Sequence, residues 1–273
     1  MLSETVRSFA AAGLGIKVVG APLRGSEKGI FQFDIGRSRA GEYFRIWPGA
    51  RDNTFSVLDV DRNFRQVLLS VREPRRPFEQ HEYQWGDRTR ESVDRDVRRR
   101  GGEVVRDCGR YWVVRFWTSP LTRRYLCGFD ERSLFIAQIS EGRTVAEAHE
   151  ALMPDEVARY PQPVVRQGEW FFLPVSDAEL EALHEYLPGH PRSHRREEGI
   201  EPGGHPHVAD EIVRVDRRYP RNGRVIRRMD LYVRGRIRHA DHQTVAFEEW
   251  RRTVKNRAVI PAGADRQRLR WID

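Results

Sequence analysis

Short runs in which apolar and polar residues alternate dominate the N-terminal quarter of the chain. Alternation with a period of two is typical of β-strands with one buried face, and these runs are rich in aromatic and β-branched residues. Four strands are therefore predicted, at residues 30–35, 42–47, 54–60 and 64–71. Residues 61–63 (Asp-Arg-Asn) suit a hairpin turn between the last two, and Pro74 and Pro77 end the unit.

The middle of the chain mixes strand and helix signals. Strands are expected at residues 111–117, 125–128, 133–139 and 169–175. Thr144 and Ser176 suit the N-cap position, which predicts helices that end before Pro154 and at residues 188–189. The charged residues 79–102 show no clear period and predict either an exposed helix or a linker.

The C-terminal segment carries the strongest hairpin signal. Residues 211–219 and 224–233 flank Asn222 and Gly223, a pair that tolerates the positive φ angles of a two-residue turn. A third strand is expected near residues 244–250. Together these elements predict an α+β fold, mainly antiparallel sheets with a few short helices. Three units are expected: a β-rich unit at residues 1–75, a mixed α+β unit at 76–190 and a basic hairpin unit at 191–273.

Charge is distributed very unevenly along the chain. Residues 214–273 contain 17 Arg and Lys against 7 Asp and Glu, a net charge of +10, whereas the preceding 213 residues have a net charge of −2. A cationic segment on a near-neutral body predicts a localised contact with a polyanion.

The arginines of the C-terminal hairpin are the candidate contact. A two-residue turn at 222–223 makes Arg217 face Arg228 and Arg218 face Arg227. A basic two-stranded ribbon can follow the phosphates of RNA or DNA, and tryptophans can stack on unpaired bases. The candidate nucleic-acid-binding residues are Arg217, Arg218, Arg221, Arg224, Arg227, Arg228, Arg234, Arg236, Arg238, Arg251, Arg252, Lys255, Trp250 and Trp271.

The leading hypothesis is therefore a non-catalytic protein that binds the backbone of RNA or DNA, alone or as a subunit of a nucleoprotein assembly. Two other interpretations of the ribbon remain open. Its arginines can pair with acids of the same chain on a solvated hairpin edge, or the ribbon can dock an acidic protein subunit.

Histidines supply a second candidate chemistry. His205 and His207 precede the first hairpin strand, while His239, Asp241 and His242 follow the second. Unbroken pairing puts His207 opposite Arg238 and turns His239 to the other face, unless a bulge shifts the register by one residue. These five residues would suit zinc or another divalent metal, so the alternative function is a metal-dependent phosphodiesterase or nuclease. The leading hypothesis requires no cofactor, and no motif identifies a catalytic residue.

Several features suggest a cytoplasmic protein. Cys108 and Cys127 are the only cysteines, which excludes a disulfide framework, and no apolar run is long enough to span a membrane. Lysine is confined to Lys17, Lys28 and Lys255, an arginine bias that is typical of a GC-rich bacterial genome.

Two stretches of the sequence resemble a known protein family. Residues 126–139 (LCGFDERSLFIAQI) and 166–174 (RQGEWFFLP) are similar to distinctive stretches of an uncharacterised bacterial protein family. The resemblance implies a globular unit and brings no activity with it.

Overall fold

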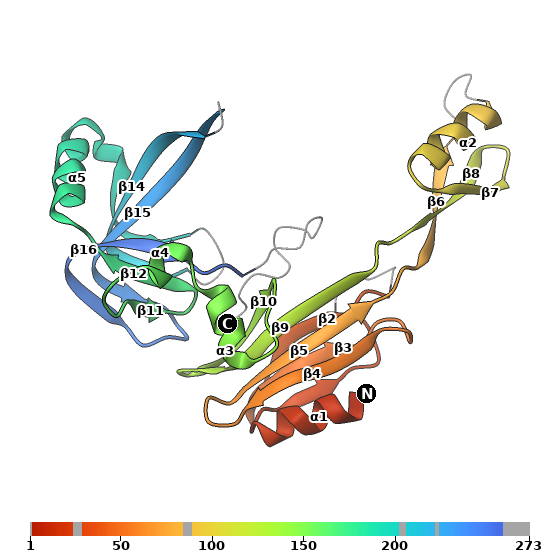
Figure 1. Cartoon of the computed structure of the whole chain (residues 1–273), viewed down its shortest axis with the longest axis horizontal. Helices are drawn as coiled ribbons and strands as arrows, with labels where there is room; N and C mark the ends of the chain where they lie inside the picture. The colour runs from red at the N-terminus through yellow and green to blue at the C-terminus, as the bar shows by residue number, and fades with distance from the viewer. Residues whose placement is uncertain (1, 24–28, 84–88, 202–205, 222–223, 259–273) are drawn as a thin grey trace.

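The structure, a computed structural model, describes residues 2–23, 29–83, 89–201, 206–221 and 224–258. Half of the chain is strand and a fifth is helix, which confirms the predicted α+β class. Figure 1 shows three parts: a central body with the N-terminus, an arm that projects from one end of it, and a C-terminal sheet beyond the other end. Among the described residues, no helix is both long and apolar enough to cross a bilayer.

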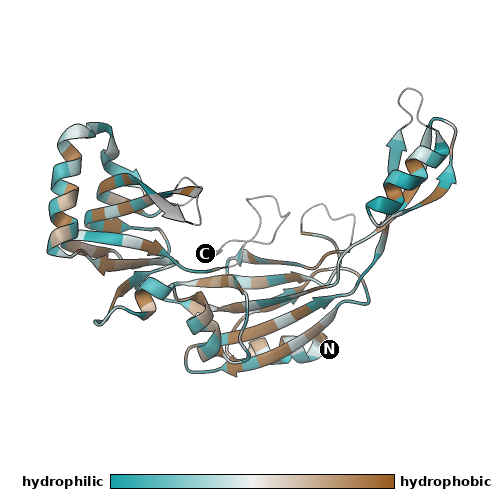
Figure 2. Ribbon diagram, turned by 45° about the horizontal axis from the view of Figure 1, so that its top comes forward, coloured by the Kyte–Doolittle hydropathy of each residue, from teal (hydrophilic) through white to brown (hydrophobic). Residues whose placement is uncertain are grey.

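The central body is built from two antiparallel or mixed sheets. One has the order β1-β3-β2, and the other has the order β10-β9-β5-β4. The elements are α1 (Leu2–Ala11), β1 (Ile16–Val18), β2 (Gln32–Ser38), β3 (Gly41–Trp47), β4 (Thr54–Asp61), β5 (Gln66–Glu73), β9 (Leu121–Asp130) and β10 (Ser133–Ile139). Alternate residues of both sheets share one core with Phe9 of α1, and Figure 2 shows the resulting hydrophobic stripes. Phe31, Phe44 and Tyr125 lie in this core with at most 2% of their surface exposed.

The second face of the larger body sheet is covered by a helix. Thr144 caps α3 (Val145–Leu152) by accepting a hydrogen bond from the Glu147 N–H at 3.1 Å. Ala148 and Leu152 then pack on Leu126 and Phe135 of the sheet. The short α4 (Asp155–Ala158) follows and leads towards the C-terminal sheet.

The arm interrupts the body sheet between β5 and β9, which pair with each other. Its own sheet has the order β6-β8-β7, with β6 (Pro77–Tyr83), β7 (Glu103–Asp107) and β8 (Tyr111–Trp117). Helix α2 (Arg90–Arg99) packs on one face of that sheet through Val93 and Val97, against Trp112, Val114 and Phe116. The charged segment at 79–102 is thus a strand followed by a helix, whose apolar stripe consists of only two valines.

The C-terminal sheet has the order β11-β12-β16-β15-β14-β13. Its elements are β11 (Val165–Gln167), β12 (Trp170–Pro174), α5 (Asp177–Gly189), the 3-10 turn η1 (Pro191–Ser193), β13 (His194–Gly199), β14 (Val208–Arg221), β15 (Arg224–Arg238) and β16 (Val245–Lys255). Because β12 pairs with β16, this sheet includes β11 and β12, which precede the domain boundary expected at residue 190. Leu183 of α5 covers one face by packing on Val213 and Tyr232.

The β14–β15 register matches the predicted pairing near the turn and departs from it further away. Arg217 pairs with Arg228 and Arg218 with Arg227, as expected. A β-bulge then places Gly235 and Arg236 opposite the single residue Asp210, so that Val208, not His207, pairs with Arg238. Gly235 has a φ of +83°, and the Asp210 carboxylate accepts a 3.0 Å hydrogen bond from the Arg236 N–H. The expected pairing of His207 with Arg238 is therefore wrong by one residue.

Substitution of Gly235 by alanine should destabilise the C-terminal sheet. A Cβ at this position would lie 2.7 Å from the Asp210 Cβ, and the left-handed backbone would be strained as well. We expect the free energy of unfolding to fall by about 2 kcal/mol, as measured by urea denaturation. Gly109→Ala is the matched control, because its φ is +77° and a Cβ there would meet nothing within 4 Å. Equal losses in the two variants would contradict the close contact at the bulge.

Candidate metal centre and basic ribbon

Three histidines meet where the β14–β15 hairpin enters the sheet. His207 precedes β14, His239 follows β15, and His242 lies in the next turn. One ligand atom from each lies within 4.8 Å of the others, and the ring centroids are 4.3 to 5.5 Å apart. The bulge brings them together, because the one-residue shift places His207 beside His239.

Burial keeps His207 in the form that binds a metal. His207 is only 3% exposed, and its Nε2 atom makes no hydrogen bond. Burial, followed by the neighbouring His239 and His242 and by Lys255, lowers the pKa of His207 to about 3. At neutral pH the imidazole is therefore uncharged, and protons do not compete for its lone pair.

A glycine leaves the space into which two of the imidazoles point. Gly168 lies in the turn between β11 and β12 with a φ of +55°, and a Cβ there would lie 2.6 Å from the His242 Nε2 and 3.2 Å from the His207 Nε2. The side-chain amide of Gln167 holds this turn by donating to the carbonyls of Ile237 (3.2 Å) and Gln243 (2.6 Å). The two Nε2 atoms thus converge on a small space beside a fixed backbone.

The central body supplies the outer partner of the cluster. Glu131, in the β9–β10 turn, has a left-handed φ of 50° and accepts a 2.6 Å hydrogen bond from the Gln243 N–H. Its Oε2 lies 4.0 Å from the Nδ1 of His242. A carboxylate behind a ligating histidine orients the ring and increases its basicity. The candidate centre therefore spans the contact between the body and the C-terminal sheet.

Asp241 has a different role from the predicted one. Its carboxylate lies 3.5 Å from Arg37 of the body, and its backbone N–H donates to the Nδ1 of His239 at 3.2 Å. His205, the fifth candidate, lies outside the described residues. Of the five predicted ligands, the structure brings together His207, His239 and His242. Neither Gly168 nor Glu131 was predicted, because nothing in the linear spacing connects them to the hairpin.

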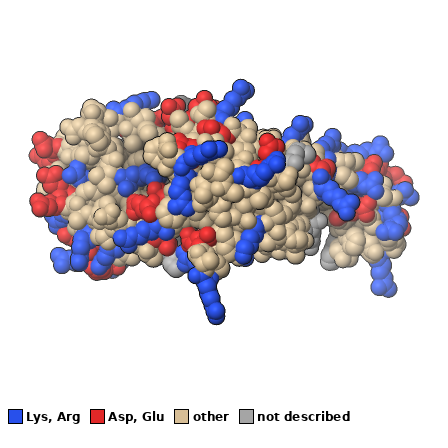
Figure 3. Space-filling view, turned by 90° about the horizontal axis from the view of Figure 1, so that it is seen from below, with Lys and Arg blue, Asp and Glu red and all other residues tan. Residues whose placement is uncertain are grey.

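The basic ribbon is extensively paired with carboxylates of the same chain. Arg234 forms a bidentate pair with Glu211, in which its Nε donates to Oε1 at 3.1 Å and its Nη2 donates to Oε2 at 3.0 Å. The ion pairs of the predicted nucleic-acid contact include Arg217–Asp230, Arg227–Asp216, Arg228–Glu156, Arg234–Glu211, Arg236–Asp210, Arg238–Glu197, Arg251–Glu249, Arg252–Glu156, Arg252–Glu179 and Lys255–Glu201. Figure 3 likewise shows basic and acidic side chains interspersed on the face that it presents.

The remaining candidates of the ribbon differ among themselves. Arg218 is exposed and has no ion pair within the described ranges, while the side chains of Arg221 and Arg224 lie outside them. Trp250 is only 5% exposed and packs in the core with Leu183, so its interpretation as a base-stacking residue is wrong. Trp271 lies outside the described residues. Nucleic-acid binding through the ribbon, and docking of an acidic protein, stay predictions that require the carboxylates to be displaced.

One set of pairs joins the ribbon to α4. Glu156 accepts a 2.7 Å hydrogen bond from Arg228 of β15 and another from Arg252 of β16. Burial would raise the pKa of Glu156, but the hydrogen bonds from Arg252 and Arg228 outweigh burial and lower it. The ionised carboxylate is therefore favoured in the folded protein.

The variant Glu156→Gln should lose a pH-dependent part of the stability. A lowered pKa gives stabilisation that is present above the ordinary carboxyl pKa and is lost as the pH falls through the folded value. We expect the variant to be less stable than the wild type by about 1 kcal/mol at pH 7, a small value for solvent-screened pairs, and the difference to disappear as the pH falls through the lowered pKa of Glu156. Urea denaturation across this range measures both. Glu181→Gln is the control. Glu181 is exposed and has no ion pair in the described part of the chain, so this substitution should have no such effect.

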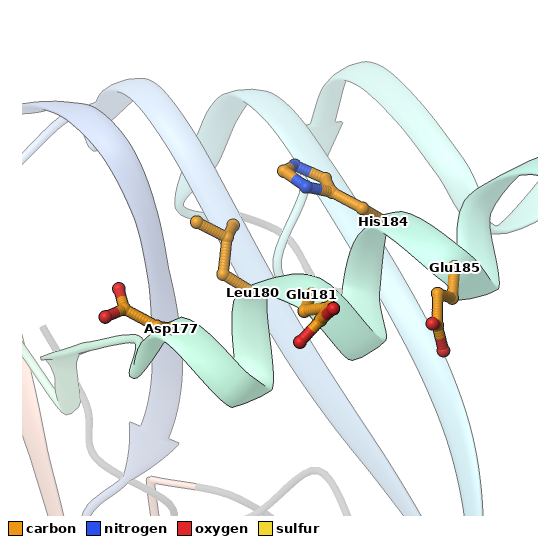
Figure 4. Close-up of a pocket in the computed structure, with 5 residues that line it drawn as sticks. All are labelled: Asp177, Leu180, Glu181, His184 and Glu185. Atoms are coloured by element: carbon orange, nitrogen blue, oxygen red, sulfur yellow. The ribbon is translucent and has the colours of Figure 1, made fainter.

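A shallow hollow over α5 offers no comparable site. Asp177, Leu180, Glu181, His184 and Glu185 line it, all from one helix. Figure 4 shows their polar groups spread along the helix and pointing in different directions. They have no common point at which a ligand could be held.

Comparison with known proteins gives no relative. No family model matches the chain, and no match was found among curated proteins or among solved structures.

Proposed function

We propose that this protein binds a divalent transition-metal ion, zinc in the first place, through His207, His239 and His242. The observation that supports this most directly is the buried, unsatisfied Nε2 of His207, which shares with the His242 Nε2 the space beside Gly168. A buried polar atom without a hydrogen bond is costly, so its retention needs a reason. Three imidazoles are a ligand set that zinc and its neighbours prefer.

Binding requires only a small contraction of the cluster. Tetrahedral coordination with zinc–nitrogen distances of about 2.1 Å places ligand nitrogens about 3.4 Å apart, whereas the ligand atoms here lie within 4.8 Å. His239 would also have to release the Asp241 N–H from its Nδ1, since a neutral imidazole cannot use both nitrogens as acceptors. The buried His207 and His242 form the preformed part of the site, and His239 closes it.

The number of ligands favours a second candidate function. Within the described residues the cluster contains three ligating side chains, and three-ligand sites keep a fourth position for water. Bound zinc would lower the pKa of such a water to about 7. A metal-dependent phosphodiesterase built on this centre is therefore the candidate activity.

Zinc titration tests the proposal directly. Competition with a chromophoric chelator should show one zinc per chain for the wild type, and His207→Ala should weaken the affinity at least about a hundredfold, as expected for loss of a direct ligand. His184→Ala, an exposed histidine on α5, should bind as the wild type does.

Two results would contradict the proposal: no stoichiometric zinc binding by the wild type, or equal affinities for the wild type and His207→Ala. The same pair of proteins, assayed for zinc-dependent cleavage of a phosphodiester, tests the candidate activity. Cleavage that is equal in both would remove that activity without touching the metal site.

The position of the Glu131 carboxylate behind His242 leads to a separate prediction. Glu131→Gln keeps an oxygen that can accept the Gln243 N–H bond but removes the negative charge behind His242. We expect zinc affinity to fall by about tenfold to a hundredfold, with stability of the metal-free protein nearly unchanged. Glu141→Gln is the control, because Glu141 follows β10 and is exposed to solvent. An affinity equal to that of the control would show that Glu131 has no influence on the ligands.

A further inference from the structure

The arm has a second sheet face that α2 does not cover. Side chains alternate across β8, so that Trp112, Val114 and Phe116 pack against α2 while Tyr111, Val113 and Trp117 lie on the other face. Figure 1 shows the arm projecting away from the body and from the C-terminal sheet. Neither of those parts covers the second face, on which His81 and Tyr83 are exposed and Val113 is buried at 2% exposure.

Three rings form a continuous platform on this outer face. Tyr83 pairs directly with Tyr111 across β6 and β8, and His81 lies two residues from Tyr83 on the same side. The ring centroids of His81 and Tyr111 are 4.5 Å apart, and those of Tyr83 and Tyr111 are 5.9 Å apart. Tyr83 is 55% exposed, which is a large exposed area for an aromatic residue inside a strand.

Positive charge borders the platform. Arg106 pairs with Val113 and so lies on the same face, while Arg110 precedes Tyr111 and is exposed. Neither arginine has an ion pair within the described ranges. At the root of the arm, the Arg75 guanidinium lies 5.2 Å from the centroid of the Trp117 ring, a pair that extends the same surface.

Three acids in the described part of the arm already have partners. Glu79 and Glu103 both pair with Arg115, at 2.8 and 3.1 Å, and Asp107 accepts hydrogen bonds from the Gly109 N–H and the Trp112 Nε1. Residues 74–120 contain 11 arginines and 8 acids, so the arm has a net positive charge. Arginines without an ion pair among the described residues, beside exposed rings, match an anionic ligand with flat aromatic groups.

From these contacts we infer that the outer face of the arm, with Tyr83, His81, Tyr111, Arg106 and Arg110, binds single-stranded nucleic acid. Bases would stack on the rings, and the guanidinium groups would contact the phosphates. A duplex keeps its bases stacked inside, so the platform should prefer single strands, whether RNA or DNA. This function is independent of the proposed metal site and uses a different surface from the C-terminal ribbon.

Fluorescence anisotropy with a labelled single-stranded oligonucleotide, as RNA and as DNA, tests the inference on the full-length protein. The wild type should bind the single strand more tightly than the corresponding duplex. The double variant Tyr83→Ala/Tyr111→Ala should raise the Kd by about tenfold or more. Tyr83→Phe/Tyr111→Phe keeps both rings and should stay within about twofold of the wild type.

Two matched variants locate the contact. Phe64→Ala removes the most exposed aromatic of the body, at 69% exposure, and should leave the Kd unchanged. Joint replacement of Arg217, Arg218, Arg227 and Arg228 by alanine should also leave it largely unchanged. The inference is overturned if the wild type binds no oligonucleotide, if the alanine pair binds as the wild type does, or if only the ribbon variant loses binding.

Discussion

The geometry of the candidate metal centre depends on one irregularity in strand pairing, the bulge at Gly235. In an antiparallel pair, a shift of one residue exchanges the two faces of everything beyond it. Two residues of β15 oppose Asp210 alone, and this shift moves His207 from beside Arg238 to beside His239. Gly235 permits the left-handed backbone, and the Asp210 carboxylate binds the freed N–H of Arg236. Without the bulge, His207 and His239 would lie on opposite faces of the ribbon.

The centre also needs the rest of the molecule. Its space is bounded by Gly168 from the opposite edge of the same sheet, and its outer carboxylate is Glu131 from the central body. The left-handed φ of Glu131 is unusual for a residue with a side chain, and its carboxylate holds the backbone of Gln243. Four segments distant in sequence thus converge at the three histidines.

The sequence predicted local features well and distant contacts poorly. Alternation and the Asn-Gly turn predicted the strands and the Arg217–Arg228 register, since both depend on neighbours in the chain. The position of the bulge could not be predicted, because a lone glycine within a strand does not reveal which residue it will face. The arm was not predicted, since the two valines of α2 are too few to give a helical period among its charges. Gly168 and Glu131 could not be found from spacing, because they reach the histidines only through the tertiary fold.

Composition was least informative about the surface. The C-terminal excess of arginine predicted an outward-facing cationic ribbon, but pairing across the sheet places acids such as Glu211 and Asp210 against these arginines. Net charge counts residues, whereas a ligand meets only the charges that remain unpaired. Within the described residues, Arg106 and Arg110 of the arm have no ion pair, so the arm presents available guanidinium groups despite its smaller excess of positive charge.

The most direct test of the central claim is the crystal structure of the zinc-loaded protein, with anomalous diffraction measured on both sides of the zinc absorption edge. The account predicts one strong anomalous peak beside Gly168, within about 2.1 Å of a nitrogen of each of the three histidines. A zinc peak at another position, or no peak between these rings in crystals soaked with a saturating zinc concentration, would contradict this expectation.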